Sequence, residues 1–332
     1  MGPSAAKPVA VDAMGGDRAP EEIVAGARAA AGELGIPVVL IGDPERIGDA
    51  GGLDVVPARE VIEMHEDPAK GVRRKKDSSL VRAAEAVRDG RASAMVSAGN
   101  TGAAMASALL RLGRLPGVAR PAIATPIPVP GAGPTVLLDA GANAECSPEW
   151  LVQFAQMGSA FARVRFGLPE PRVGLLSIGE EETKGNSLVK EAHRLLASGA
   201  GGAAVKFIGN VEGRDLMTDA VDVVVTDGFT GNVALKTLEG GMKFLVGAVL
   251  GAISALGPEV SEQVIGALAP LAGELDPDAY GGAMLLGVDG VCIISHGSSS
   301  ARAIVNAIRV ASEAVAAGLV DELRRATAVP ST

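Results

Sequence analysis

The feature that most constrains this chain is a series of short Val, Ile and Leu runs in which apolar and polar residues do not alternate. A strand without alternation is apolar on both faces and fits a parallel sheet covered by helices on both sides. The predicted strands are Pro8–Val11, Val38–Ile41, Asp54–Val56, Ala94–Ser97, Thr135–Leu138, Val173–Ile178, Val205–Ile208, Val221–Thr226 and Val291–Ser295. Helical patterns between them include Glu21–Leu34, Ser79–Arg88, Pro148–Phe166 and Ser187–Ala197. This alternation predicts an α/β protein with three α/β/α layers.

The length of 332 residues suits one large α/β domain or two lobes. No stretch has the composition of a linker, so we predict a single domain over 1–332 with a flexible tail at 1–7. The longest apolar run, Phe244–Leu256, is shorter than the roughly 20 residues of a membrane-spanning helix. Pro258 interrupts the helical pattern, which resumes over Val260–Leu275, so a hydrophobic helical hairpin is predicted within 244–282.

Two segments repeat one pattern, an apolar strand followed by Gly-x-Thr-Gly and a helix: Ala94–Leu110 and Val223–Leu238. The glycines leave backbone N–H groups open at the helix start, and such a start binds phosphate or carboxylate without a side chain. Each motif alone is equally well an ordinary strand-to-helix turn, but the repetition favours a paired anion-binding cleft. The residues expected to contact substrate are Gly99, Thr101, Gly102, Gly228, Thr230 and Gly231.

Two further loops follow predicted strands and begin with aspartate. Ligands of open α/β sheets bind beyond the carboxyl ends of the strands, so these loops are also candidates for substrate binding. Their candidate residues are Asp12, Gly15, Gly16, Asp139 and Asn143. Taken alone, Asp12, Asp139 and Asp227 are each better explained as caps of the helices that follow. Together they could hold a divalent metal, but no spacing specifies one, and we predict no metal site.

The motifs of several enzyme classes are missing from the sequence. No G-x-G-x-x-G follows a strand, there is no Walker A sequence, and no G-x-S-x-G elbow occurs, so we predict no nucleotide cofactor. His65, His193 and His296 lack the spacing of metal ligands. His193 is expected on a helix surface, whereas His296 follows a strand in SHGSS and is a better site candidate.

Charge and cysteine content limit the partners and the compartment. The net charge is −9 and the chain has no extended basic stripe, so nucleic acid is not an expected partner. The start of the chain lacks the apolar segment of a secretory signal, and Cys146 and Cys292 lie far apart. A reducing cytoplasm is therefore the expected setting, with both cysteines as small buried residues.

The loop motifs resemble a known family, the bacterial phosphate acyltransferases of phospholipid synthesis, usually called PlsX. The matching stretches are VDAMGGD (Val11–Asp17), RRKKDSS (Arg73–Ser79), SAGNTGA (Ser97–Ala103), LLDAGAN (Leu137–Asn143), GEEETKGN (Gly179–Asn186), FIGNVEGRD (Phe207–Asp215), TDGFTGN (Thr226–Asn232) and ISHGSS (Ile294–Ser299). They are collinear and cover nearly the whole chain. The sequence departs from the family pattern at Met284, where members often have proline.

The resemblance implies an activity, partners and a fold. The implied reaction transfers a fatty acyl group from acyl carrier protein to inorganic phosphate and gives an acyl phosphate for phospholipid (phosphatidic acid) synthesis. A homodimer is implied as well. The implied fold is a three-layer, Rossmann-like sandwich with a mixed, mostly parallel sheet, akin to isocitrate dehydrogenases and phosphotransacetylases.

This reaction needs cations and N–H donors that gather the charge of phosphate and of the developing oxyanion. Lys184, alone between two glycines at a strand end, can supply the cation, and the neighbouring glutamates are expected to be solvated. Asparagines at glycine-rich loop tips can donate amide hydrogen bonds, although such residues also serve as turn formers. The predicted catalytic residues are Lys184, Asn232, Asn100 and His296, with Asn143 and Asn186 as substrate contacts. Neither cysteine has an activating motif, so we expect direct attack by phosphate without an acyl-enzyme.

An acidic enzyme that binds an acidic carrier protein needs a local basic patch. The densest one is Arg73, Arg74, Lys75 and Lys76, which is either the docking surface, part of the phosphate site or a solvated loop. No Lys or Arg occurs from Phe244 to Ala301, so membrane contact through the hairpin is expected to be weak, hydrophobic and insensitive to salt. Packing in the core or at a dimer interface is the alternative for the first hairpin helix.

Two other functions compete with the acyltransferase. An NAD-dependent decarboxylating dehydrogenase of the same fold group would use the aspartates for metal. A lipid-associated scaffold would present Phe244–Leu256 to a membrane but would not need so many glycine-rich loops.

Overall fold

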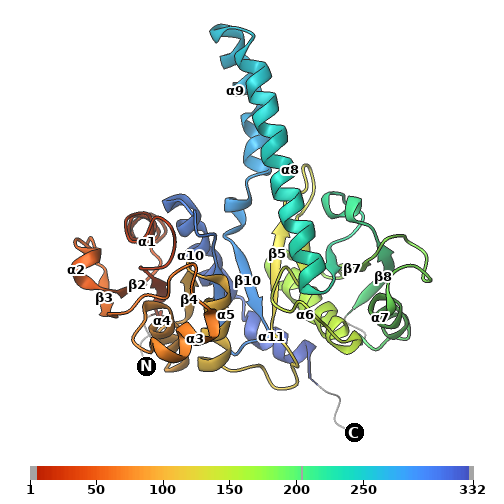
Figure 1. Cartoon of the computed structure of the whole chain (residues 1–332), viewed down its shortest axis with the longest axis horizontal. Coiled ribbons are helices and arrows are strands. Elements are labelled where there is room, and N and C mark those ends of the chain that lie inside the picture. The colour runs from red at the N-terminus through yellow and green to blue at the C-terminus, as the bar shows by residue number, and fades with distance from the viewer. Residues whose placement is uncertain (1–5, 203–204, 329–332) are drawn as a thin grey trace.

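The computed structural model of the chain describes residues 6–202 and 205–328, so most of the predicted tail at 1–7 lies outside the described residues. Within them, eleven strands form one sheet in the order β3-β2-β1-β4-β11-β10-β5-β6-β9-β7-β8 (Figure 1). The strands are β1 (Val9–Asp12), β2 (Val38–Gly42), β3 (Asp54–Pro57), β4 (Ala94–Ser97), β5 (Ala122–Ile127), β6 (Thr135–Leu138), β7 (Arg172–Leu176), β8 (Lys206–Val211), β9 (Val223–Val225), β10 (Ala283–Leu286) and β11 (Val291–Ile294).

The helices follow the predicted alternation with strands, and the three-layer fold is confirmed. They are α1 (Glu21–Leu34), α2 (Pro44–Ile47), α3 (Pro68–Arg74), α4 (Ser79–Arg88), α5 (Thr101–Arg111), α6 (Pro148–Phe166), α7 (Ser187–Ala197), α8 (Gly228–Ser254), α9 (Pro258–Glu274), α10 (Ala301–Ala316) and α11 (Leu319–Ala326), with the 3-10 turns η1 (Gly213–Met217) and η2 (Pro277–Tyr280).

The sheet consists of two parallel blocks joined by antiparallel strands. β3, β2, β1, β4 and β11 are parallel to one another, and so are β6, β9, β7 and β8. Between the blocks, β10 pairs antiparallel with β11 and β5, and β5 pairs antiparallel with β6. The sequence did not reveal β5 and β10, because AIATPI contains a proline and a threonine and AMLL has no β-branched residue.

Both faces of the sheet are buried, which explains why the strands do not alternate. In β1, Val9 and Val11 belong to one apolar cluster and Ala10 to the other, and all three are at most 1% exposed. α1, α6 and α10 cover the first cluster, whereas α4 and α5 cover the second. The aliphatic composition is therefore divided between two thin cores, one on each side of the sheet.

The hydrophobic hairpin projects from the body as an arm (Figure 1). Its first helix, α8, has 27 residues and starts inside the TDGFTGN motif, well before the apolar run. The apolar side chains of the arm are largely exposed in the single chain: Phe244 is 78% exposed and Ile265 49%. Packing in the core of the same chain, one alternative for the first helix, is therefore not what the structure shows. Judged by length and composition, none of the described helices would cross a membrane alone, although the bent pair of α10 and α11 passes that test together.

An ion pair holds β7 against β9, the two strands that lead into the Lys184 loop and into α8. Asp222, just before β9, accepts hydrogen bonds from the backbone N–H of Arg172 at 2.6 Å and from its guanidinium at 2.8 and 3.0 Å. Burial alone would raise the pKa of the Asp222 carboxyl, but the hydrogen bonds and charge of Arg172 outweigh it, and the pKa is lowered.

We predict that Asp222→Asn lowers the free energy of unfolding by about 1.5–3 kcal/mol at neutral pH, the usual contribution of a hydrogen bond to a charged group. Because the folded-state pKa is lowered, this contribution is complete above the ordinary pKa of 3.8 and is lost as the pH falls below it. Urea unfolding at a series of pH values measures both effects. The more exposed Asp219→Asn is the control and should cost less. A difference between wild type and Asp222→Asn that does not shrink in acid would contradict the assignment.

Candidate active site

The loops that follow β1 and β4 pack against each other around a buried aspartate. Asp12 is 2% exposed and accepts hydrogen bonds from the Ser97 hydroxyl at 2.7 Å and from the Met14 backbone N–H at 3.3 Å. Burial raises the pKa of the Asp12 carboxyl, and these hydrogen bonds oppose the rise. A Cβ on Gly15 would lie 2.9 Å from Gly99 Cα, so only glycine permits the two loops to approach this closely. Asp12 thus organises the glycine loops and does not cap a helix.

The loop after β11 joins the same cluster. The backbone N–H of Asp17 donates to the Gly297 carbonyl at 2.8 Å, and Gly16, with a φ of +118°, makes the turn that brings the two together. His296, which directly precedes Gly297, is exposed.

Asn100 ties this cluster to the loop that precedes α3. Its Oδ1 accepts from Ala103 and caps α5, while its Nδ2 donates to the carbonyls of Glu63, Met64 and Glu66 at 2.9–3.3 Å. Its amide is therefore used within the protein, and a catalytic role for Asn100 stays a prediction. The predicted substrate contacts Thr101 and Gly102 open α5 beside it, with Thr101 exposed.

The other parallel block carries a second buried aspartate, Asp139, at the end of β6. Its carboxylate is 0% exposed and accepts from the backbone N–H groups of Ile123, Gly141, Ala142 and Asn143 and from the Asn143 side-chain amide, at 2.8–3.2 Å. Burial raises the pKa of the Asp139 carboxyl, against the effect of these donors. Like Asp12, Asp139 holds a loop in shape.

The start of α8 lies directly on this loop. A Cβ on Gly231 would fall 2.0 Å from the Asp139 carbonyl oxygen, and the Gly228 N–H donates to the Asn143 carbonyl at 2.7 Å. Asp227 caps the helix by accepting from the backbone N–H and the hydroxyl of Thr230, as the capping alternative predicted. The four predicted residues at this helix start therefore share one tightly packed turn.

Two exposed residues follow in α8: Asn232, whose side chain lies beside Gly141 of the Asp139 loop, and Lys236, which reaches the other block. Asn232 is exposed, and its amide has no hydrogen-bond partner among the described residues. Lys236, four residues on and so on the same helix face, contacts His296 at 3.2 Å between Nζ and Nε2 and pairs with Glu239 at 2.8 Å. Sequence reasoning missed Lys236, although its spacing from Asn232 was a usable signal. The contact with His296 shows that α8 and the loop after β11 meet.

Lys184 lies in the loop that leaves β7. Its backbone N–H donates to the Glu181 carbonyl at 2.9 Å, which closes a turn, and its side chain is exposed with no ion-pair partner in the described part of the chain. Asn186 caps α7 by accepting a hydrogen bond from the Val189 N–H, so it has a structural role. Its contact with substrate stays a prediction. Because β7 and β9 are parallel neighbours, the Lys184 loop and the start of α8 leave adjacent strand ends.

Metal ligation and thiol chemistry receive no support from the geometry. No group of three His, Cys, Asp or Glu side chains suited to a metal occurs among the described residues. Burial raises the pKa of Cys146 and of Cys292 to about 12. Both thiols are therefore protonated at neutral pH and are poor nucleophiles.

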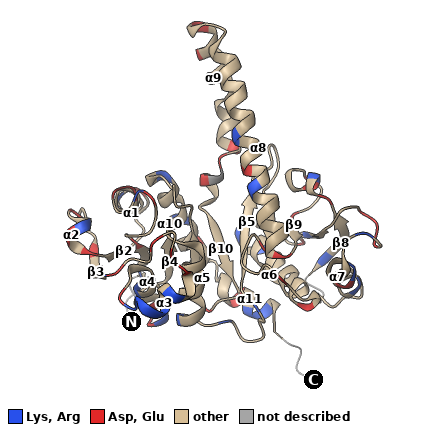
Figure 2. Ribbon diagram, in the orientation of Figure 1, with Lys and Arg blue, Asp and Glu red and all other residues tan. Residues whose placement is uncertain are grey.

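The basic patch lies on and after α3 (Figure 2). Arg73, Arg74 and Lys76 are exposed, but Lys75 is turned inward, where its ammonium binds Glu66 and the Val61 carbonyl. Three of the four residues of the run thus remain on the surface.

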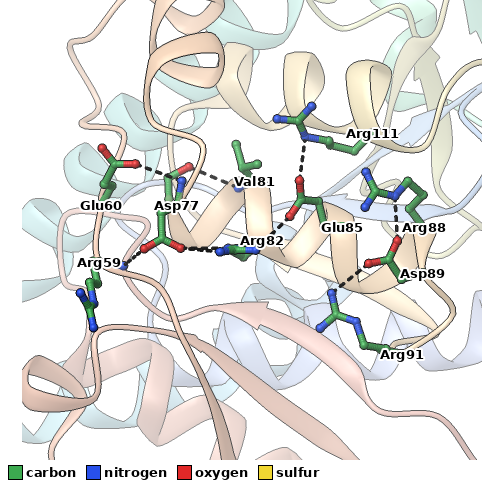
Figure 3. A network of polar contacts seen from close by, with 11 residues as sticks. Arg59, Glu60, Asp77, Val81, Arg82, Glu85, Arg88, Asp89, Arg91 and Arg111 are labelled. Carbon is green, nitrogen blue, oxygen red and sulfur yellow. Dashed lines mark hydrogen bonds and ion pairs between the residues drawn. The ribbon is translucent and has the colours of Figure 1, made fainter.

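Arg82, one turn into α4, is also exposed but belongs to a network of ion pairs. Its guanidinium binds Asp77 at 2.9 Å and Glu85 at 3.5 Å, and Glu85 in turn binds Arg111 (Figure 3). The positive charge of Arg82 is therefore offset within the protein.

The arrangement of the sheet and its glycine-rich loops defines a class of protein. A phosphotransacetylase from Streptococcus pyogenes has the same fold, with a TM-score of 0.64 at 16% identity, covering 94% of each chain. EutD phosphotransacetylase from Staphylococcus aureus gives a TM-score of 0.60 at 16% identity, covering 93% of this chain and 94% of that one. The molecule is thus an α/β protein with the phosphotransacetylase fold.

Sequence similarity identifies the family within this fold. The family model described as "Fatty acid synthesis protein" matches residues 8–322. The phosphate acyltransferase of Pelotomaculum thermopropionicum is 51% identical over 332 residues, which covers 95% of this chain and 94% of that protein. The chain therefore belongs to the phosphate acyltransferase family of fatty acid synthesis proteins and is an acyltransferase. This assignment excludes the dehydrogenase and scaffold alternatives as its main function.

Proposed function

We propose that this acyltransferase moves a fatty acyl group from acyl carrier protein to inorganic phosphate and releases an acyl phosphate for phospholipid (phosphatidic acid) synthesis. The observation that carries the proposal is Lys184, an exposed ammonium without an ion-pair partner among the described residues, at a strand end beside the glycine-rich start of α8. An unpaired ammonium suits a phosphate dianion or an oxyanion. The N–H groups of Gly228 and Thr230 at the start of α8 are already bonded to Asn143 and Asp227.

In the proposed reaction a phosphate oxygen attacks the thioester carbonyl carbon, and the carbonyl electrons move to its oxygen. The tetrahedral oxyanion collapses, the C–S bond breaks, and the electron pair leaves with sulfur as the thiolate of the carrier protein. A thiol has a pKa of about 8.5, so departure of the thiolate needs little help from an acid. Lys184 stabilises the developing negative charge, and Asn232 and Lys236, on the exposed face of α8, contact phosphate or the oxyanion. This chemistry needs no cysteine nucleophile, in accord with the raised thiol pKa values.

The patch formed by Arg73, Arg74 and Lys76 is the proposed docking surface for the acidic carrier protein. These side chains have no ion-pair partners among the described residues, and the net charge of −9 makes long-range attraction elsewhere unfavourable. α3 begins against the loop held by Asn100, so a carrier protein on this patch lies beside the glycine cluster around Asp12.

The arm is the proposed site of both homodimer formation and weak, peripheral membrane contact at the cytoplasmic face. Its apolar side chains are exposed along both helices, and a contiguous apolar surface of this kind marks a protein or membrane contact. α8 is assigned to the dimer interface. α9, none of whose described residues is buried, is assigned to lipid, and without Lys or Arg its contact has to be hydrophobic.

We expect Lys184→Ala to lower kcat by about 100-fold or more, as for loss of an oxyanion-hole donor. The assay combines acyl-acyl carrier protein, phosphate and enzyme and traps acyl phosphate with hydroxylamine. Lys190→Ala, which removes a nearby exposed lysine from α7, is the matched control and should keep nearly full activity. If Lys184→Ala keeps activity within about threefold of wild type, Lys184 has no catalytic role, because loss of one such donor lowers kcat far more. Failure of wild type to form acyl hydroxamate would reject the reaction itself.

Charge reversal tests the docking surface. Arg73→Glu/Arg74→Glu should raise KM for the acyl carrier protein substrate roughly tenfold or more while leaving KM for phosphate unchanged, because rim charges act on the association of the partner. Arg46→Glu, at an exposed position of α2, is the control. Equal increases in both KM values would instead assign the patch to the phosphate site.

Liposome co-sedimentation tests the arm. Wild type should bind weakly and to the same extent at low and high salt and on neutral and anionic lipid, and Ile265→Glu/Leu268→Glu should abolish binding. Gln263→Glu, at an exposed polar position of α9, is the control. Binding that requires anionic lipid and disappears in salt would refute a hydrophobic contact.

A further inference from the structure

A buried amide on β8 is the strongest unassigned feature near the Lys184 loop. Asn210 is 6% exposed, and its Nδ2 donates to the Glu181 carbonyl at 2.9 Å. The same carbonyl accepts the Lys184 backbone N–H at 2.9 Å and so closes the turn that presents Lys184. One side-chain amide therefore bonds the oxygen on which the turn depends.

A histidine fixes the orientation of that amide. His193 Nδ1 lies 2.9 Å from Asn210 Oδ1, and because Nδ2 of Asn210 must donate to a carbonyl, Oδ1 must accept and His193 must donate. The imidazole also packs edge-on against Phe207, with ring centroids 5.2 Å apart. His193 is thus half-buried and bonded, in contrast to the surface position expected from its place in a helix pattern.

An irregularity in β8 makes this geometry possible. The pairing with β7 shifts between Val173–Phe207 and Gly174–Gly209, so β8 contains one extra residue there, and Gly209 has a φ of +106°. In a regular strand, residues three apart point to opposite faces. The bulge reverses that alternation and lets Asn210 and Phe207 both face His193 on α7, as bulges beside active sites do when they redirect a side chain.

We propose that the pair His193–Asn210 is a positioning device that holds the Lys184 turn in its reactive conformation through the Glu181 carbonyl. The two residues touch no reacting atom; they act through Lys184. The turn has few other restraints: Ser177 N–H donates to the Val211 carbonyl at its start, Asn186 caps α7 at its end, and an exposed ion pair joins the Glu180 side chain to Arg214 at 3.4 Å. Between these points the amide of Asn210 is the only side chain for which the described residues show a hydrogen bond to the turn backbone. This inference rests on the proposed role of Lys184.

Asn210→Ala and Asn210→Asp test the clamp, because neither side chain offers an N–H, although Asp keeps an acceptor for His193. Both should speed amide hydrogen exchange at Lys184 and lower kcat between about 10- and 100-fold, the range that follows a small misplacement of a catalytic group. In the Lys184→Ala background the same change should cost almost nothing, since the clamp acts through that lysine.

Two matched variants separate positioning from general damage. Glu181→Ala keeps the main-chain carbonyl and should leave exchange and kcat near wild type. His193→Gln preserves a donor for Asn210 and should retain most activity, whereas His193→Leu should not. These two His193 variants keep the test decisive if Asn210 variants fold poorly.

The outcomes distinguish the inference from the reaction on which it rests. Unchanged exchange at Lys184 in Asn210→Ala would overturn the clamp whatever the enzyme's chemistry. An effect of Asn210→Ala on kcat that is equally large with and without Lys184 would overturn its action through that residue. If Lys184→Ala itself retains activity while exchange still rises in Asn210→Ala, the clamp stands and the proposed role of Lys184 fails.

Discussion

The burial of the Asp139 carboxylate is the interaction on which the block formed by β6, β9, β7 and β8 depends. A charged group inside a protein is tolerated only when hydrogen bonds replace its hydration. Asp139 achieves this by collecting N–H donors from the antiparallel strand β5 and from its own loop, through Gly141 and Asn143. This close packing requires glycine at position 231, because the start of α8 contacts the Asp139 backbone and leaves no room for a side chain. One carboxylate thus links the central strands of the sheet to the position of α8 and Asn232.

For the proposed reaction, an acidic protein that binds an acidic carrier protein and phosphate needs positive potential at a few places only. The structure leaves Lys184, Arg73 and Arg74 without ion-pair partners in its described part, while Arg82, Arg172 and Lys75 are neutralised by nearby carboxylates. These unpaired cations produce a local attraction for anions that the net charge of −9 opposes at long range. In the proposed reaction this contrast selects where the anions bind.

Much of the sheet could be predicted from the sequence, because strands buried on both faces, such as β1 and β4, have unbroken apolar runs. The antiparallel strands β5 and β10 could not, since a threonine and a proline interrupt the apolar run of AIATPI and AMLL has none of the β-branched residues typical of strands. The site loops were found by their glycines, but the partners of their side chains were not. Whether the amide of Asn100 or Asn186 is free for substrate depends on contacts with Glu63 or Val189, which only the folded backbone brings into reach. Asn210 was hidden for a further reason: the bulge at Gly209 reverses the face on which a regular strand would place it.

The position of α8 connects the site with the arm. Its first turn, fixed by Gly228 and Gly231 on the Asp139 loop, carries Asn232, and the same unbroken helix continues for 27 residues into the exposed apolar arm (Figure 1). Lys236, near the start of the same helix, contacts His296 in the other parallel block. α8 therefore joins the two blocks of the sheet at its beginning and carries the apolar surface of the arm at its end, so its first residues serve the candidate site and its last residues serve the arm.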